Sequence, residues 1–135
     1  MTLHFNTTQK TLEPLIRKYP SQTFAVQADV EDEVAVSNAI ERSCQKLGSI
    51  DILIVNHGIW PTEDVLVKDM TLKQWNHTLG VNLTGTFLFI REFLKQVEKY
   101  KLKDGVSIVL IGSTAGKFGE AYHTGNFFFF FFIKS

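Results

Sequence analysis

The stretch that decides the fold is residues 50–58, which read Ile-Asp-Ile-Leu-Ile-Val-Asn-His-Gly. Its first six residues are almost all β-branched or leucine, which is typical of a strand buried on both faces of a parallel sheet. Polar residues and a glycine, Asn56 to Gly58, follow directly. Because parallel sheets bind ligands beyond the carboxyl ends of their strands, this stretch predicts a buried strand that leads to a ligand edge.

Strand and helix patterns alternate on both sides of this stretch. A helix is expected to begin at Asp32, a residue that caps first-turn amides, and to stop at Gly48. An earlier helix is expected to start near Asn6 and to run toward Lys18, with Pro14 early in it, where the proline either bends the helix or delays its start. Further strands are expected at 1–5, 24–30 and 106–111. This alternation predicts an α/β fold built on a doubly wound parallel sheet.

The longest predicted helix covers residues 72–97. Thr71 and Gln74 form a capping box at its start. Asn82 lies beside its apolar stripe, where a buried amide needs partners: it is a satisfied core residue or a functional one. The apolar residues of the stripe recur every three or four positions, at Leu72, Trp75, Leu79, Leu83, Phe87, Ile90, Leu94 and Val97.

Composition limits the classes of function. The 135 residues carry 14 Lys and Arg against 14 Asp and Glu, so no net charge attracts nucleic acid or an anionic membrane. The apolar runs are shorter than a membrane helix requires. The single cysteine, Cys44, allows no internal disulfide, which fits a reducing, cytoplasmic location. The four histidines are not spaced as metal ligands, so no metal site is expected.

Polar and small residues at three strand ends are the candidate site. Asp29 can accept hydrogen bonds from an adenine amino group or cap the helix behind it. Asn56 can bond a ribose or bridge strands, and Gly58 allows close approach of a flat ligand or makes a turn. Ser113 lacks the Gly-x-Ser-x-Gly elbow of a nucleophile, so orienting a substrate carbonyl is the better interpretation.

Four clusters, taken in order and spacing, resemble the middle of a short-chain dehydrogenase/reductase over roughly residues 1–121. The clusters are Asp29-Val30, 56–59, Trp75 with 81–85, and 112–116. The resemblance implies a partial doubly wound, Rossmann-like sheet that binds NAD or NADP, with hydride passing between nicotinamide and a small-molecule carbonyl or alcohol.

The same resemblance implies a role for each candidate residue. Asp29 and Val30 would meet the adenine ring, and Asn56 with Gly58 would support the sheet and the cofactor ribose. Asn82 would hold a water in a proton relay. Ser113 would hydrogen-bond the substrate oxygen.

Two parts of the family pattern have no counterpart in this sequence. Family members begin with a strand and a glycine-rich turn for the pyrophosphate. In the order 3-2-1-4-5-6 that strand is central, so we expect two half-sheets with open edges. The family's Tyr-x-x-x-Lys pair is not found either: Tyr122 is followed four residues later by Asn126, and Phe130, four before Lys134, has no hydroxyl. We therefore expect this chain to be inactive alone.

Cofactor choice and partners follow from the same comparison. Residues 3–7 lack the acidic residue that favours NAD, so the preference is for NADP. The complete enzyme is expected to take a small-molecule substrate, with neither nucleic acid nor membrane as a partner. A homo-oligomer is expected to form through the helix at 72–97.

Residues 122–135 are interpreted as an aberrant tail, separate from the domain at 1–121. Phe127–Phe132 implies a long pyrimidine tract in the message, as precedes splice acceptors, so we expect translated intron or a shifted frame from about Tyr122, with Met1 an internal start. The alternative is a genuine tail that favours self-association.

Rival functions are a non-enzymatic fragment that associates with a full-length relative, or the product of an incomplete gene model. A flavodoxin-like binding domain accounts for neither Asn82 nor Ser113.

Overall fold

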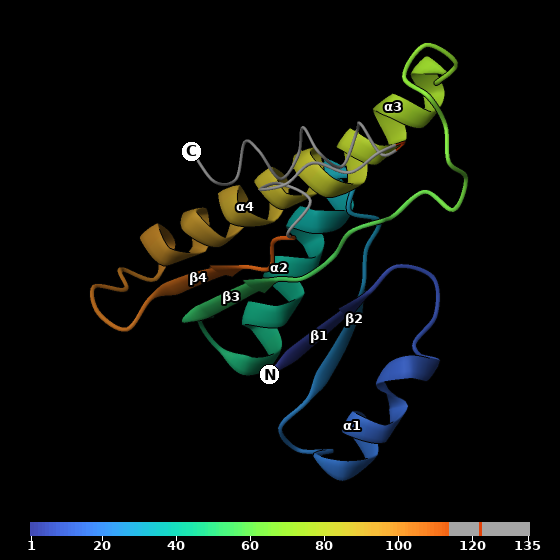
Figure 1. The fold of residues 1–135 in the computed structure, drawn as a ribbon. Helices are drawn as coiled ribbons and strands as arrows, with labels where there is room; N and C mark the ends of the chain where they lie inside the picture. Colours follow the sequence, from blue (N-terminus) through green and yellow to red (C-terminus); the bar gives the residue numbers. More distant parts are fainter. Residues whose placement is uncertain (114–121, 123–135) are drawn as a thin grey trace.

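The computed structural model describes residues 1–113 and Tyr122 of the 135-residue chain (Figure 1). Strands and helices alternate along the described residues, as the sequence predicts. In chain order the elements are β1 (Thr2–Phe5), a 3-10 turn (Lys10–Leu12), α1 (Glu13–Lys18), β2 (Phe24–Gln27), α2 (Glu33–Leu47), β3 (Ile52–Val55), α3 (Leu72–Leu79), a π-helical turn (Gly80–Thr84), α4 (Gly85–Lys99) and β4 (Ser107–Leu110).

The strands form two separate parallel pairs. β1 pairs with β2, with Leu3 opposite Ala25, and β3 pairs with β4, with Ile54 opposite Val109. Within residues 1–113 no strand joins the two pairs. This split confirms the prediction of two half-sheets drawn from the missing central strand.

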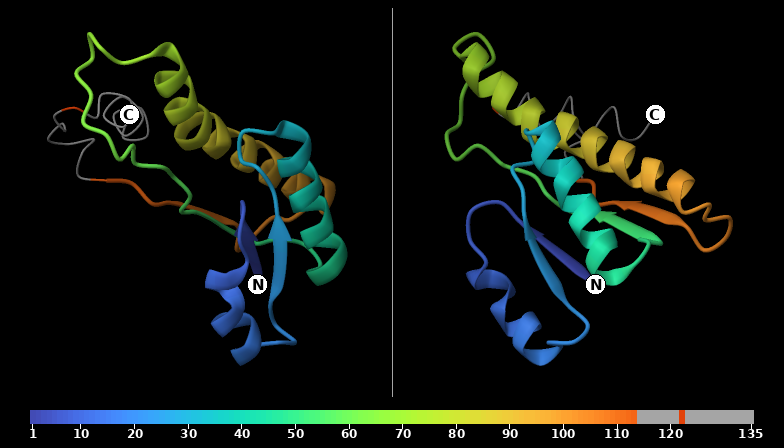
Figure 2. Two further views of the ribbon diagram at one scale, coloured as in Figure 1. Left: turned by 90° about the vertical axis from the view of Figure 1, so that its right-hand side faces the viewer. Right: turned by 180° about the vertical axis from the view of Figure 1, so that it is seen from behind.

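The helices pack in layers around these strands. In the left view of Figure 2, α1 lies on one side of β1 and β2 and α2 lies on the other. α2 and α4 pack against each other, and α4 also contacts β3. The main core lies between these elements and contains Val30, Val36, Ile40, Cys44, Val81, Leu88 and Phe89.

One face of β3 is not covered by any described residue, contrary to the prediction for this stretch. Val55, on the α4 side, is 6% exposed, whereas Ile52 is 57% and Ile54 is 63% exposed. Successive strand residues point to opposite faces, so the continuous apolar run places half of its side chains on the open face. The prediction of a strand was right, and the prediction of two covered faces was wrong for residues 1–113.

The helix boundaries follow their capping residues. The Asp32 carboxylate accepts hydrogen bonds from the amides of Val34 (2.8 Å) and Ala35 (3.1 Å), and α2 ends at Gly48, whose φ of 87° is left-handed. The capping box of Thr71 is also present at the start of α3. The first helix does not start near Asn6; its start is delayed, which is the alternative that Pro14 left open.

That first helix begins at Glu13 rather than near Asn6. A 3-10 turn precedes it, and Pro14 lies in its first turn. Proline is favoured there because its missing N–H has no helical partner and its φ is already helical. The proline therefore sets where the helix starts.

The helix predicted at 72–97 is interrupted by the π-helical turn. Its closing bond runs from the Gly85 amide to the Gly80 carbonyl, five residues apart, so the turn holds one extra residue. This extra residue rotates α4 relative to a straight helix. Phe87 and Leu94 of the predicted stripe are about half exposed, and the large apolar residues that α4 buries are Leu88, Phe89 and Phe93.

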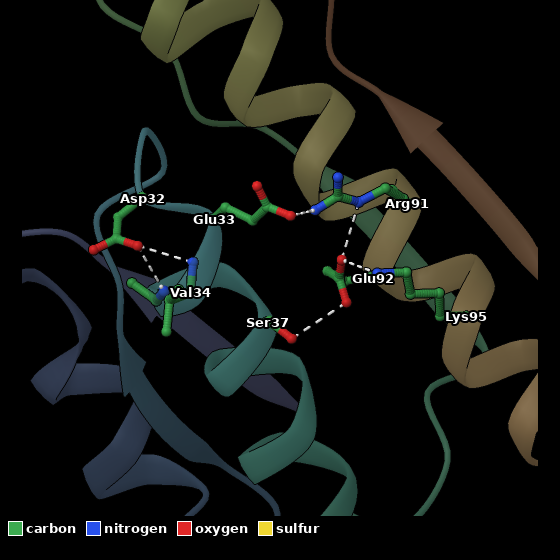
Figure 3. Close-up of polar contacts among 8 residues, drawn as sticks. Asp32, Glu33, Val34, Ser37, Arg91, Glu92 and Lys95 are labelled. Carbon is green, nitrogen blue, oxygen red and sulfur yellow. Dashed lines mark hydrogen bonds and ion pairs between the residues drawn. The ribbon is translucent and has the colours of Figure 1, made fainter.

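A polar cluster joins α2 to α4 (Figure 3). Glu92, 7% exposed, accepts hydrogen bonds from Arg91 (3.0 Å), Lys95 (2.8 Å) and Ser37 of α2 (3.3 Å). Arg91 also pairs with Glu33 at 2.7 Å. Burial alone would raise the pKa of Glu92, but the hydrogen bonds from Lys95 and Arg91 outweigh it and the pKa is lowered. The carboxylate therefore stays ionised between the helices.

Among the described residues, no helix combines the length and the apolar character needed to cross a membrane.

Candidate functional site

Asn82 is buried in the π-helical turn, with 1% of its surface exposed. Its Oδ1 accepts a hydrogen bond from the Ile59 amide (2.8 Å), and its Nδ2 donates to the Ile59 carbonyl (3.0 Å). Both bonds go to the backbone of the segment that follows β3. The amide therefore fastens the turn to the end of β3, as expected of a satisfied core asparagine.

Gly58 makes room for this contact. A Cβ at Gly58 would lie 3.3 Å from Oδ1 of Asn82, closer than side chains normally pack. In the structure the close neighbour of this glycine is Asn82, and the close approach of a flat ligand stays a prediction. Gly58 itself remains exposed.

His57, in the same segment after β3, also supports this turn. Its Nε2 lies 3.1 Å from the Val81 carbonyl, a bond in which the ring nitrogen must donate because a carbonyl can only accept. Its ring packs on Phe89, with centroids 5.7 Å apart. Burial lowers the pKa of His57, the bond to Val81 opposes the shift, and the charge of nearby His4 adds to it. The neutral imidazole is thus favoured here.

The loop between β2 and α2 covers both ends of the turn. A Cβ at Gly85 would lie 3.0 Å from Cβ of Val30 and 3.0 Å from Nε2 of His57. A Cβ at Gly80 would collide with the carboxylate of Glu31. Glycines therefore bracket Asn82 because consecutive residues of another loop press on both positions.

The two residues predicted to meet an adenine ring differ in their exposure. The side chain of Asp29 is exposed and accepts a hydrogen bond from the Glu31 amide at 3.0 Å, which makes a local turn. Asp32 rather than Asp29 caps α2. Val30 is 4% exposed and belongs to the core. Asp29 is therefore the member of the pair that presents a side chain at the surface.

Asn56 and Ser113 are both exposed and follow the two paired strands β3 and β4. The Ile111 amide donates to the Val55 carbonyl at 3.0 Å, which extends the pairing past the ends of both strands. Since these strands are parallel, Asn56 and Ser113 follow the same edge of the sheet. Residues 114–121 and 123–135, and with them the predicted Phe-rich tail beyond Tyr122, lie outside the described residues.

Exposed polar side chains follow two strands, Asp29 after β2 and Asn56 after β3. An exposed carboxylate at Asp29 can accept from an amino group, and an exposed amide at Asn56 can bond hydroxyls. No glycine-rich phosphate turn stands in the sequence. The described residues contain no group of three His, Cys, Asp or Glu side chains that could hold a metal.

Sequence reasoning missed the residues that hold the turn in place. His57, Gly80 and Glu31 were not assigned to the site, although each contacts the turn or packs against it. Gln96 was missed as well: its amide bonds the Ile50 backbone at the other end of β3. One available signal was the pair of glycines on either side of Asn82. A contact between two loops distant in sequence leaves no comparable pattern.

Known proteins resemble this chain in sequence and in fold. A family model described as short chain dehydrogenase matches residues 2–125. The 3-oxoacyl-[acyl-carrier-protein] reductase FabG of Aquifex aeolicus is 32% identical over 112 residues, which cover 83% of this chain and 44% of the relative. Glucose 1-dehydrogenase 2 of Bacillus subtilis is 29% identical over 97 residues, covering 72% and 37%.

A solved structure of a short-chain dehydrogenase/reductase from Brucella melitensis superposes with a TM-score of 0.83 at 20% identity. The match covers 98% of this chain and 54% of that chain. The fold is therefore a partial Rossmann-like α/β fold. The aligned part spans less than half the length of the two curated relatives.

Proposed function

The chain belongs to the short chain dehydrogenase family, and from this premise we propose that the complete protein is an NAD(P)-dependent oxidoreductase. Its substrate is a small-molecule carbonyl or alcohol, and NADP is preferred because residues 3–7 carry no acidic side chain. The observation that supports the proposal is the meeting of two strand-end segments, residues 30–31 after β2 and 57–59 after β3, at the turn of Asn82. When bound, the nicotinamide supplies or accepts the hydride.

The described residues have these roles in the proposal. Asp29 accepts from the adenine amino group while Val30 anchors the loop beside the ring. Asn56 and Gly58 form the ribose side of the site. Asn82 holds a water in a proton relay, and Ser113 donates a hydrogen bond that orients the substrate oxygen.

This chain alone is proposed to bind the adenosine half but to carry out no turnover. No Tyr-x-x-x-Lys pair supplies the general acid and base that proton transfer to the substrate oxygen requires. Oxidation of NADPH or NADH with a simple carbonyl, abolished by Ser113→Ala, would contradict this part of the proposal.

Nucleotide binding is tested by titrating the labelled chain with 2′,5′-ADP and with 5′-ADP while following backbone amide signals by NMR. We expect shifts at Asp29, Val30 and Asn56, larger at equal concentration for 2′,5′-ADP. Asp29→Asn preserves the turn to the Glu31 amide, because an amide oxygen also accepts, but it removes the charge. The Asp29→Asn variant should bind both nucleotides more weakly than the unmodified chain.

The matched control is Asp69→Asn, which makes the same change in an exposed residue of another loop. Its binding should equal that of the unmodified chain. Shifts confined to other parts of the chain, or equal weakening by both variants, would contradict the assignment of Asp29.

A second candidate function is association through the helix at 72–97, as a homo-oligomer or with a full-length relative. It is favoured by the exposed apolar residues of α4: Phe87 is 54% and Leu94 is 50% exposed. Analytical ultracentrifugation tests it, because Leu94→Glu should shift an oligomer toward the monomer. A monomer at all concentrations would contradict the homo-oligomer.

A further inference from the structure

The carboxylate of Glu31 reaches from the β2–α2 loop to α3. Its Oε2 lies 2.9 Å from Nδ1 of His77, and the ring nitrogen donates because an ionised carboxylate has only acceptors. The two side chains are 35% and 59% exposed, so water screens the pair and its strength is modest. The contact nevertheless joins segments that are 46 residues apart.

The same carboxylate lies on Gly80, the first residue of the π-helical turn. A Cβ at this position would meet Oε1 of Glu31, with its Cδ at 3.0 Å and its Cγ at 3.4 Å. The end of the Glu31 side chain therefore occupies the space that any other residue at position 80 would fill.

Val30, the residue before Glu31, makes a similar close contact at the other end of the turn. Val30 packs on Gly85, the residue that closes the turn. Asn82 lies between these two contacts. A π-helical turn lacks the regular bonds of the α-helix, so its shape depends on contacts from outside the helix.

We propose that Glu31 is a positioning residue that holds the turn of Asn82 on the loop carrying Asp29. The inference rests on the proposed function, in which Asp29 meets the adenine ring and Asn82 serves the proton relay. It goes beyond that function because it links the two positions: a nucleotide bound at Asp29 and Val30 changes the surroundings of Asn82 through the contact that Glu31 makes with the turn.

The first test is hydrogen exchange of two backbone amides in the full chain. The Ile59 amide donates to Asn82 and the Ile50 amide donates to Gln96, so the two report on opposite ends of β3. Glu31→Ala removes the positioning side chain. Gly80→Ala displaces its carboxylate without changing Glu31 itself. Both variants should speed exchange at Ile59 about threefold, the range of a partly exposed ion pair, and leave Ile50 unchanged.

The matched control is Glu33→Ala, because Glu33 lies two residues away and pairs with Arg91 of α4 instead. Exchange at Ile59 should not change in this variant. Glu31→Gln keeps the length of the side chain and a hydrogen bond to His77, so it should restore part of the protection. Unchanged exchange at Ile59, or equal acceleration at Ile59 and Ile50, would overturn the proposal.

A second readout separates this inference from the proposed function. We expect 5′-AMP to shift the Val30 amide signal and the side-chain amide signal of Asn82, with the shift at Asn82 lost in Glu31→Ala. If Val30 does not respond, the nucleotide site is contradicted, and the exchange result still decides the positioning contact. If Asn82 responds equally with and without the Glu31 carboxylate, the proposed link is overturned.

Discussion

The two ends of β3 are held by the same chemistry in different surroundings. At one end Asn82 makes two bonds to the Ile59 backbone, and at the other Gln96 makes two bonds to the Ile50 backbone, at 3.2 and 2.7 Å. Both side chains are buried, at 1% and 5% exposure. Taken alone, the two amides are structural equivalents.

Their surroundings separate them. Gln96 lies within the regular helix α4, and the Cys44 thiol is a further hydrogen-bond partner. Asn82 lies in a π-helical turn that is bracketed by glycines and contacted by a loop with an exposed carboxylate. A buried amide therefore does not mark a functional site by itself. Asn82 differs from Gln96 in the irregular backbone around it and in the segments that pack against that backbone.

Removing each amide tests the equivalence and should give the largest effect. Gln96→Met and Asn82→Leu keep the approximate shape but leave an N–H and a C=O of the partner backbone without a bond. Each should lower the free energy of unfolding by about 2–3 kcal/mol, measured by urea denaturation. Gln45→Met, at an exposed position of α2, should change it by less than about 0.5 kcal/mol.

A loss below about 0.5 kcal/mol for Gln96→Met would contradict the structural role of its amide. A much smaller loss of unfolding free energy for Asn82→Leu than for Gln96→Met would contradict the claim that the two amides stabilise the two ends of β3 equally.

The glycines around Asn82 offer a sharper test of its surroundings. Gly85→Ala should destabilise the fold by about 1–2 kcal/mol, because the new Cβ would meet the β-carbon of Val30, which can move only with its backbone. Gly80→Ala should be nearly neutral, because the end of the flexible Glu31 side chain can move away. Thermal unfolding measures both. Equal effects would mean that the loop does not press on the turn as described.

The pH dependence of stability is the smallest expected effect. Burial lowers the pKa of His57 in the folded state, so the unfolded chain binds more protons as the pH falls below its ordinary value of 6.5. The contribution of His57 to the free energy of unfolding is fully present above that value. It is lost as the pH falls, by at most about 1.4 kcal/mol per pH unit. Urea midpoints across this range should show a steeper fall for the unmodified chain than for His57→Gln. Identical profiles would contradict the role of His57.

Much of the local structure was predictable from short patterns. Asp32, Gly48 and the capping box of Thr71 placed the helix ends because capping is decided within a few residues. The split of the sheet was predictable because the family's strand order places a central strand between the two pairs, and residues 1–113 contain no such strand. The covered faces of β3 were not predictable, since burial depends on what packs against a strand.

The sequence by itself determined the order of strands and helices, their caps and the strand ends at which candidate residues stand. These properties depend on neighbours three or four positions away, so they are visible as periodicity and as capping residues. Only the tertiary structure decided that the long helix turns through an extra residue at Gly80–Thr84, that Asn82 bonds Ile59, and that Glu31 lies on Gly80. Those contacts join residues 23 or more positions apart, and their geometry exists only when the layers pack together.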